Sequence, residues 1–480
     1  MKKTTEKQPN KNSKQSRQKS LIALNNMKFL YLSLFILLAI HLAYFVVFSS
    51  DNLAINTYNP RLDQLEKNIL RGKILDAQGE ILAETVIYED EEQRIYPFEN
   101  AFSHVVGYSI QGKTGIEAAV DLSLLRSHMP IYDLVVSELT NKKKIGDDVV
   151  TTLNTELQVT ASDLLDGQKG AIIAIEPATG KILCMVSKPD FNPNDLILNW
   201  ENLINDEENS TLLNRVTQGL YPPGSTFKIL TTMEYLNENP TDPFVYTCEG
   251  SDDFEGKVIH CYNGTAHGEE TLIHAFSKSC NTAFATIGES MDFHAFDTLT
   301  KKMLFNQPLP YDMPTSVSSF KLKEGDSSAQ VAETVIGQGE TMITPLHNAL
   351  IVSAIANGGL LMKPYVIDRI DNTDGTIVHQ YLPESYKQLI DPSMTKTITE
   401  YMVDVVNNGT GVNAASDNYQ VACKTGSAEN PFGDDHAWFV GFAPAENPKI
   451  VLAIVVENAG SSGSSAVPMA KELFDIYLKK

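Results

Sequence analysis

The longest apolar run in the chain lies near its N-terminus. Residues 29–48 contain no Asp, Glu, Lys or Arg, and a helix of this length spans about 30 Å, the thickness of a bilayer core. A cleaved signal peptide would have a shorter apolar region followed by a small-residue cleavage site. Lys and Arg side chains precede the run, so the positive-inside rule places the N-terminus in the cytoplasm. The pattern predicts a retained, single-pass plasma-membrane anchor with the bulk of the chain outside the cytoplasm.

A basic tail precedes this run. Residues 1–28 carry eight Lys or Arg side chains and one acid, and residues 1–26 have almost no apolar side chains before Leu21. This composition predicts a disordered cytoplasmic segment. The rest of the chain has 30 basic and 59 acidic side chains. Because phosphate binding needs a basic surface, the acidic bulk argues against nucleic acid as a partner.

A small domain follows the anchor. Ile74, Ile81 and Leu82 flank a turn that contains Gly79, and this pattern predicts a β-hairpin. The neighbouring segments show short apolar stretches without an internal repeat and without obvious chemistry. We assign residues 49–155 to a small, mixed N-terminal stalk domain.

We expect the remaining residues, 156–480, to form one larger domain. Apolar runs separated by turn residues predict β-hairpins at 170–187 and 436–456. The middle of the domain, 195–415, has mainly helical periodicity, and 466–478 predicts a terminal amphipathic helix. Strands on both sides of a helical middle imply a single sheet that is assembled from distant segments.

Ser225 and Lys228 form the pattern S-x-x-K directly after a Pro-Pro-Gly turn. Apolar residues then recur at helical spacing, which predicts a helix that begins near Ser225. Residues three apart lie on one helix face, so the hydroxyl and the amine can touch. Serine becomes a nucleophile when a base takes its proton, and lysine can be that base when burial lowers its pKa. By itself, however, the pattern is more typical of an N-cap serine and a surface lysine.

Two further motifs carry related chemistry. Ser279-Cys280-Asn281 lies between helical segments and offers a hydroxyl that can relay protons and an amide that donates and accepts hydrogen bonds. In isolation it is more typical of helix capping. Lys424-Thr425-Gly426-Ser427 follows an apolar stretch and is predicted at the end of an edge strand. Its cation and hydroxyl suit a substrate carboxylate, and its glycine admits a substrate backbone.

The chain has five cysteines: Cys184, Cys248, Cys261, Cys280 and Cys423. An exported location permits disulfides, and Cys248 and Cys261 flank a polar loop that a disulfide could close. Cys261 with His260 and His267 also suggests zinc, although the spacing matches no standard ligand set. The residues leave both alternatives open.

The three motifs S-x-x-K, S-x-N and K-T-G occur in that order, each in its expected context. This arrangement resembles that of the penicillin-binding proteins, and the chain is similar to class B members, the monofunctional D,D-transpeptidases. The resemblance extends from Asn59 to the C-terminus. It includes segments 71–76, 115–117, 170–187, 221–224, 337–339, 344–345, 409–411 and 437–441.

The resemblance implies an α/β (α+β) fold. The expected core is a penicillin-binding, serine β-lactamase-like transpeptidase domain, with a central antiparallel sheet flanked by helices and a helical subdomain. The expected parts are a cytoplasmic tail at 1–28, a transmembrane anchor at 29–48, a dimerisation or pedestal-like stalk at 49–155, and the transpeptidase domain at 156–480.

The resemblance also implies roles for single residues. The expected catalytic residues are Ser225, Lys228, Ser279, Asn281 and Lys424, and the expected substrate-binding residues are Thr425, Gly426 and Ser427. Ser225 would attack the penultimate D-Ala carbonyl of a cell-wall stem peptide, with Lys228 as base. Ser279 would shuttle protons, and Asn281 would hold the substrate amide. Lys424 and Thr425 would position the terminal carboxylate, while the backbone N–H groups of Ser225 and Ser427 would form the oxyanion hole.

The implied partners follow from this chemistry. They are peptidoglycan stem peptides and β-lactam antibiotics, and no metal or organic cofactor is needed. A transpeptidase alone cannot polymerise glycan, so the anchor and stalk are expected to dock on a SEDS-type glycan polymerase. The implied process is cell-wall synthesis in elongation, division or sporulation, which the residues do not separate.

Three other functions share some of these features. A membrane-bound β-lactam sensor would need several spans and a cytoplasmic signalling part, and the chain has one predicted span and a short tail. A β-lactamase would need a deacylating water, and the stalk and retained anchor disfavour it. A non-catalytic scaffold would often lack one of the motifs, whereas all three are intact.

Overall fold

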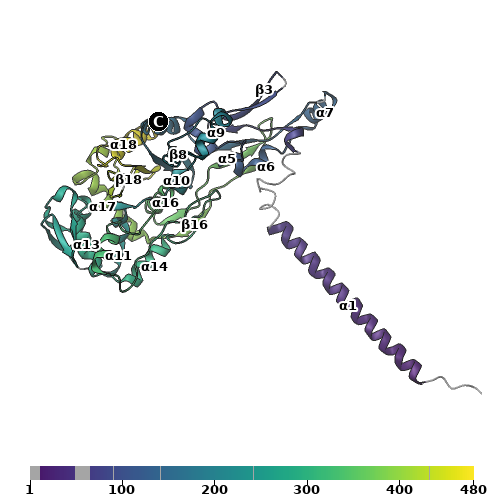
Figure 1. The fold of residues 1–480 in the computed structure, drawn as a ribbon, viewed down its shortest axis with the longest axis horizontal. Coiled ribbons are helices and arrows are strands. Elements are labelled where there is room, and N and C mark those ends of the chain that lie inside the picture. Colours follow the sequence, from purple (N-terminus) through teal and green to yellow (C-terminus); the bar gives the residue numbers. More distant parts are fainter. Residues whose placement is uncertain are drawn as a thin grey trace, which may run out of the picture. The chain divides into compact units, whose positions relative to one another are not determined.

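The computed structural model describes residues 11–48, 65–89, 91–140, 142–241, 243–431 and 433–479. The chain divides into two units, Met1–Arg61 and Leu62–Lys480. In the first unit the structure describes helix α1 (Lys11–Phe48), purple in Figure 1. Within α1, residues 22–44 are long and apolar enough to cross a membrane. By its length and composition, this helix fits the predicted single-pass membrane anchor.

Helix α1 overlaps the predicted anchor and corrects the prediction of a disordered tail. The helix begins at Lys11, whereas we expected disorder over 1–26, of which residues 1–10 lie outside the described part. The run from Lys11 to Phe48 contains neither Pro nor Gly. Because these are the residues that most strongly oppose helix, nothing in the polar segment ends the helix before the apolar run begins.

A five-stranded antiparallel sheet lies at the centre of the second unit. Its strands are β7 (Gly170–Ile175), β8 (Ile182–Lys188), β17 (Ala422–Ala428), β18 (His436–Ala443) and β19 (Ile450–Val456), in the order β17-β18-β19-β7-β8. Both predicted hairpins are confirmed, and the two ends of the domain meet where β19 pairs with β7. Strand β17 is an edge strand as predicted, but the K-T-G motif lies within it rather than at its end.

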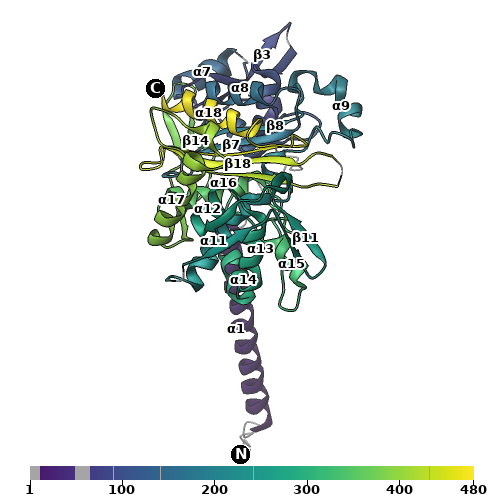
Figure 2. The same ribbon diagram turned by 90° about the vertical axis from the view of Figure 1, so that its left-hand side faces the viewer.

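Helices cover both faces of this sheet. Helix α16 (Pro345–Ala356) packs against β7, β18 and β19, α8 (Thr155–Leu164) packs against β8, and α18 (Ala466–Leu478) packs against β18 and β19. Figure 2 shows α8 and α18 on one side of the sheet and α16 on the other. The central strands β7, β18 and β19 are therefore almost continuous apolar runs rather than alternating ones. The predicted fold class and terminal helix are confirmed.

The segment between the two hairpins contains more strands than predicted. Besides α16, its α-helices are α9 (Leu196–Ile204), α10 (Arg215–Gln218), α11 (Lys228–Glu238), α12 (Leu272–Ser277), α13 (Asn281–Glu289), α14 (Phe293–Lys302), α15 (Ser328–Val335) and α17 (Pro392–Asn408). Two-stranded ladders pair β9 (Val245–Cys248) with β12 (Gly268–Thr271), β10 (Ser251–Phe254) with β11 (Lys257–His260), and β13 (Leu360–Met362) with β16 (Ser385–Gln388). The prediction of a mainly helical middle is wrong for these strands. They are short and largely exposed, so they carry no alternating apolar pattern.

A second sheet has six strands in the order β15-β14-β6-β2-β3-β4. Its strands are β2 (Ile74–Leu75), β3 (Ile81–Tyr88), β4 (Glu91–Ile95), β6 (Asp148–Thr151), β14 (Ile367–Asp371) and β15 (Ile377–Gln380). The predicted hairpin is confirmed as β2 and β3. Strand β14 pairs with β6, so the sheet of the expected stalk takes two strands from the C-terminal segment, which the pattern did not predict. The domain boundary at 155 stays a prediction.

A buried ion cluster stabilises the N-terminal part of the second unit. Glu117 is fully buried and accepts hydrogen bonds from Arg71 Nε at 2.7 Å and Arg94 Nε at 2.8 Å, and Arg71 also pairs with Asp121. Burial raises the pKa of Glu117, but the two guanidinium charges outweigh it and hold the pKa below its ordinary value. This ion cluster joins segment 71–76 to segment 115–117.

Candidate active site

Residues of the three predicted motifs line one cleft of about 670 Å³. Its lining includes Ser225, Ser279, Asn281, Thr425, Gly426 and Ser427, with Thr410 and Glu429 beside them. The motifs come from the start of α11, from the loop between α12 and α13, and from strand β17. The predicted convergence of these segments is therefore present in the structure.

Ser225 lies in a single 3₁₀ turn (Gly224–Phe227) that leads into α11. Close backbone contacts within and around this turn require glycine at two positions. Gly224 has a φ of 52°, and a Cβ on it would lie 2.6 Å from the carbonyl oxygen of Ser427. A Cβ on Gly337 would lie 2.0 Å from the carbonyl oxygen of Gly224, so segment 337–339 closes the site from behind. Only residues without a side chain fit these two positions.

Lys228 is fully buried, and its amine faces the second motif. Lys228 Nζ donates to the carbonyl oxygen of Ser279 at 2.8 Å and to Asn281 Oδ1 at 2.6 Å, and it lies 3.3 Å from Ser279 Oγ. Burial lowers the pKa of Lys228 to about 8. Among the hydrogen bonds that the structure describes, none joins Lys228 to Ser225, so the expected direct contact between these two residues is absent.

Ser279 lies between two buried amines. Lys424 Nζ donates to Ser279 Oγ at 3.0 Å and to the carbonyl oxygen of Thr425 at 2.9 Å. Lys424 is fully buried, and this burial, together with the charge of Lys228, lowers its pKa well below the ordinary value. The Ser279 backbone has a φ of 58°, a left-handed conformation. Such a conformation at a non-glycine residue costs free energy and is found where the surroundings hold the residue in place.

The edge strand lies directly against the turn that contains Ser225. A Cβ on Gly426 would lie 3.3 Å from the backbone nitrogen of Ser225, so any side chain there would crowd the turn. Ser225 and Ser427 both line the cleft, which is the placement that the predicted oxyanion hole requires. Asn281 is oriented by its amide nitrogen, which donates to the carbonyl oxygen of His260 at 2.8 Å.

Sequence reasoning gave no role to Thr410, and a second group, Trp438, supports the site from the sheet core. Thr410 Oγ1 shares a hydrogen bond with Thr425 Oγ1 and also lines the cleft; the segment 409–411 was the signal for it. Trp438 is fully buried, and its Nε1 donates to the carbonyl oxygen of Pro222 at 3.0 Å, which supports the turn before Ser225. His436 packs edge-on against Tyr221 at 5.6 Å.

The structure shows neither of the two arrangements that the sequence left open, a Cys248–Cys261 disulfide or a zinc site of Cys261, His260 and His267. All five are free thiols, and the Sγ atoms of Cys248 and Cys261 lie 3.6 Å apart, well beyond the S–S bond length of about 2.05 Å. His267 and Cys280 join these two cysteines in one cluster that could hold a metal ion. His260, which the sequence suggested as a ligand, is not one of its members.

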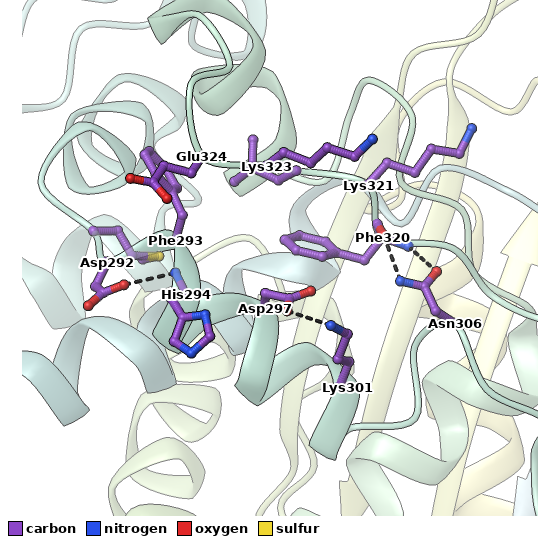
Figure 3. A pocket seen from close by; sticks show the side chains of 12 residues that line it. Asp292, Phe293, His294, Asp297, Lys301, Asn306, Phe320, Lys321, Lys323 and Glu324 are labelled. Carbon is purple, nitrogen blue, oxygen red and sulfur yellow. Dashed lines mark hydrogen bonds and ion pairs between the residues drawn. The ribbon is translucent and has the colours of Figure 1, made fainter.

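A second cavity of about 650 Å³ lies away from the motifs. It is lined by residues of α14 and of segment 320–324 (Figure 3). Its polar groups make local contacts: Asp292 caps α14, Asp297 pairs with Lys301, and Asn306 bonds the backbone of Phe320. No serine or cysteine lines it, so the cleft with Ser225 is the candidate active site.

Comparison with known proteins agrees with this fold and site. A sequence model described as "Penicillin binding protein transpeptidase domain" matches residues 170–475, and one described as "Penicillin binding protein A dimerisation domain" matches 71–149. The chain is 32% identical to the peptidoglycan D,D-transpeptidase PbpA of Mycolicibacterium smegmatis, over 90% of this chain and 94% of that protein.

Two solved structures are similar over most of their length. The ceftriaxone acyl-enzyme of M. tuberculosis penicillin-binding protein A has a TM-score of 0.78 and 30% identity, over 86% of this chain and 99% of that one. A D,D-transpeptidase domain from Eggerthella lenta has a TM-score of 0.77 and 31% identity, over 85% of this chain and 99% of that one. The fold and the matched domains define a serine D,D-transpeptidase, an acyl-transfer enzyme. The chain belongs to the class B penicillin-binding proteins.

Acylation by a labelled penicillin is expected to become faster as the pH rises and to reach half of its plateau near pH 8. The pKa of Lys228 is lowered to about 8, and only the neutral amine accepts a proton, so the reactive fraction grows as the pH passes this value. The labelling rate of the detergent-solubilised chain between about pH 6 and pH 10 measures it. Lys228→Arg, which keeps the charge but is no base, should label slowly throughout. A wild-type rate that stays flat or falls over this range would contradict the prediction.

Gly337→Ala is expected to reduce the acylation rate by at least about tenfold, since its Cβ would collide with the backbone of Gly224 and displace the nucleophile turn. Gly375→Ala is the matched control. Its φ of 83° is nearly the 82° of Gly337, but it has no atom within 4 Å of the added Cβ. The control shares the backbone strain without the collision and should label like the wild type. Equal loss in both variants would show that strain alone matters.

Proposed function

We propose that Ser225 is the acylated serine of this chain, which is a peptidoglycan D,D-transpeptidase of cell-wall synthesis that β-lactams inhibit. One observation carries the assignment. The Ser279 hydroxyl lies 3.3 Å from the amine of Lys228 and 3.0 Å from that of Lys424, in the cleft that Ser225 lines. A nucleophile, a base of lowered pKa and a proton relay are thus together at one site.

Acylation starts with the hydroxyl of Ser225. The neutral amine of Lys228 accepts the hydroxyl proton while Ser225 Oγ bonds to the penultimate D-Ala carbonyl carbon of a stem peptide. The N–H groups of Ser225 and Ser427 stabilise the resulting oxyanion. When the C–N bond breaks, the proton passes from Lys228 through Ser279 to the leaving nitrogen, and terminal D-Ala departs. Asn281 holds the substrate amide during this step.

The substrate carboxylate has a natural partner in Lys424. Two buried amines repel each other when both are charged, and this repulsion contributes to the lowered pKa of Lys424. An arriving carboxylate would offset the repulsion and favour the charged form of Lys424. The hydroxyl of Thr425, held by Thr410, would complete the carboxylate site. An amine from a second stem peptide then attacks the ester carbonyl and gives up a proton, which reaches Ser225 Oγ as the ester C–O bond breaks, and the new amide is the cross-link. Water in place of the amine would give a carboxypeptidase side reaction.

The membrane arrangement follows from the anchor and the stalk. The basic residues before the apolar run favour a cytoplasmic N-terminus and an extracytoplasmic catalytic domain. The stalk carries an exposed apolar helix face on α7 (Ile131–Thr140), where Ile131, Tyr132 and Leu139 are 85%, 77% and 82% exposed. Such a face is typical of a protein interface. It supports docking of the stalk and anchor on a SEDS-type glycan polymerase, in elongation, division or sporulation.

Ser225→Ala is expected to abolish covalent labelling by a fluorescent penicillin, because the variant has no oxygen at this position to form the ester. Gel fluorescence of purified wild type and variant measures it, with Ser461→Ala as control, since Ser461 lines the same cleft outside the motifs. Undiminished labelling of Ser225→Ala, or none of wild type, would refute the assignment. Rapid release of hydrolysed drug from the wild type would identify a β-lactamase instead.

Replacement of residues 29–48 by an unrelated span, combined with Leu139→Asp on α7, is expected to abolish co-purification of a SEDS-type polymerase from membranes. The replacement removes the anchor surface, and the new charge disrupts the apolar stalk face. Lys323→Ala, in the second cavity, is the control and should leave co-purification unchanged. If the polymerase still co-purifies with the chain that carries both the unrelated span and Leu139→Asp, the docking proposal fails.

A further inference from the structure

The segment that carries Ser225 is attached at two points to the start of helix α16. At the first point, Tyr221 and Ile343 exchange both of their backbone hydrogen bonds, with N···O distances of 3.0 Å and 2.8 Å. At the second point, Asn348 Nδ2 donates to Thr226 Oγ1 at 3.0 Å. Helix α16 itself packs on the central sheet (Figure 2). These two attachments therefore tie Ser225 to the helix that supports the sheet.

Thr226 is the residue at which the turn meets two other elements. Its side chain is buried, and its Oγ1 accepts from Asn348 and donates to the carbonyl oxygen of Pro223 at 2.8 Å. Its Cγ2 and its backbone nitrogen face the edge strand β17, each 3.3 Å from the place of a Cβ on Gly426. Because Oγ1 and Cγ2 share one Cβ, the hydrogen bond that fixes Oγ1 also fixes the methyl group against β17.

Asn348 is a polar residue in a helix that is buried along its whole length. All residues from Pro345 to Ile355 are buried, and Asn348 is 3% exposed. A buried amide costs free energy unless it is hydrogen-bonded. Leucine has nearly the same shape, is the better helix former and would bury apolar surface at no such cost. The hydrogen bond to Thr226 is the described side-chain contact of Asn348 that a leucine could not make.

We propose that Asn348 is a positioning residue that fixes the turn of Ser225 against strand β17 and thereby sets the geometry of the oxyanion hole. The inference rests on the proposed function, in which the N–H groups of Ser225 and Ser427 stabilise the oxyanion. These two donors belong to different elements, so the packing of the turn on the strand sets their separation. Donors of this kind act only where the charge develops. Asn348 does not line the cleft and acts through Thr226.

Replacement of each partner by a residue of similar shape tests this role. Asn348→Leu removes the donor and Thr226→Val removes the acceptor. Each is expected to slow covalent labelling by a fluorescent penicillin about tenfold, since a displacement of about 1 Å is enough for such a loss. The double variant should be no slower than the slower single variant, because either change breaks the same hydrogen bond. Thr226→Ser keeps the hydroxyl and should recover most of the rate that Thr226→Val loses.

The matched control is Ser353→Ala. Ser353 is a buried residue of α16 whose hydroxyl has no hydrogen-bond partner in the described part of the chain. The substitution therefore alters a polar group of the same helix without a contact to the turn, and the variant should label like the wild type.

A second readout separates positioning from stability. Labelling of the detergent-solubilised full-length chain at rising penicillin concentrations gives a maximal acylation rate and a half-saturation concentration. Because the oxyanion hole acts in the transition state, the maximal rate should fall about tenfold while the half-saturation concentration changes by less than about twofold. Melting followed by circular dichroism measures the stability of each variant, and labelling is done well below the lowest melting temperature. A lower melting temperature with an unchanged maximal rate would overturn the positioning role.

Other results would also overturn it: wild-type rates in both Asn348→Leu and Thr226→Val, additive losses in the double variant, or equal losses in Thr226→Ser and Thr226→Val. In each of these cases the wild type is labelled, and the proposed function stands. A wild type that is not labelled would refute the proposed function instead. If Asn348→Leu does not fold, the comparison of Thr226→Val with Thr226→Ser decides the question, since these two variants differ in the hydroxyl that accepts the hydrogen bond.

Discussion

Two lysine amines are buried beside the cleft that Ser225 lines, and the arrangement of the polar groups around them depends on this burial. Lys228 and Lys424 are both fully buried, and no ion pair involves either amine in the part of the chain that the structure describes. Their neighbours are the Ser279 hydroxyl, backbone and amide oxygens, and the rings of Phe284 and Phe276, at 5.2 Å and 5.6 Å. An ammonium in such surroundings loses its hydration, so the neutral, basic form becomes accessible near neutral pH. A carboxylate beside Lys228 would favour the ammonium and remove its use as a base.

The segments that bury the two lysines are distant from one another in the chain. Helix α11 presents Lys228, and the edge strand β17 presents Lys424. Glycines at 224, 337 and 426 allow the turn, the loop and the strand to approach within contact distance. Because β17 has a neighbour on one side only, its free edge keeps backbone groups available at the cleft. The large buried sheet thus serves as a rigid support for a small number of polar groups.

The cysteine cluster places a second constraint on the same loop. Ser279 and Asn281 face the lysines, while Cys280 faces the opposite way into the cluster. The cluster therefore packs the strands between Val245 and Thr271 against the loop that holds Ser279 and Asn281. The buried Arg71–Glu117 cluster has a comparable role in the N-terminal part, where it joins segments whose sequence patterns are individually weak.

Local patterns in the sequence determined the anchor, the three hairpins, the terminal helix and the order of the catalytic motifs. These features depend on periodicity and turn residues that lie close together in the chain. Only the tertiary structure decided three things: the pairing of β14 with β6, the absence of a described Ser225–Lys228 contact, and the meeting of Cys280 with Cys248, Cys261 and His267. These four residues are spaced C-x₁₂-C-x₅-H-x₁₂-C, a spacing from which no local rule predicts their contact. Contacts of this kind depend on how whole elements pack, and sequence separation carries no information about them.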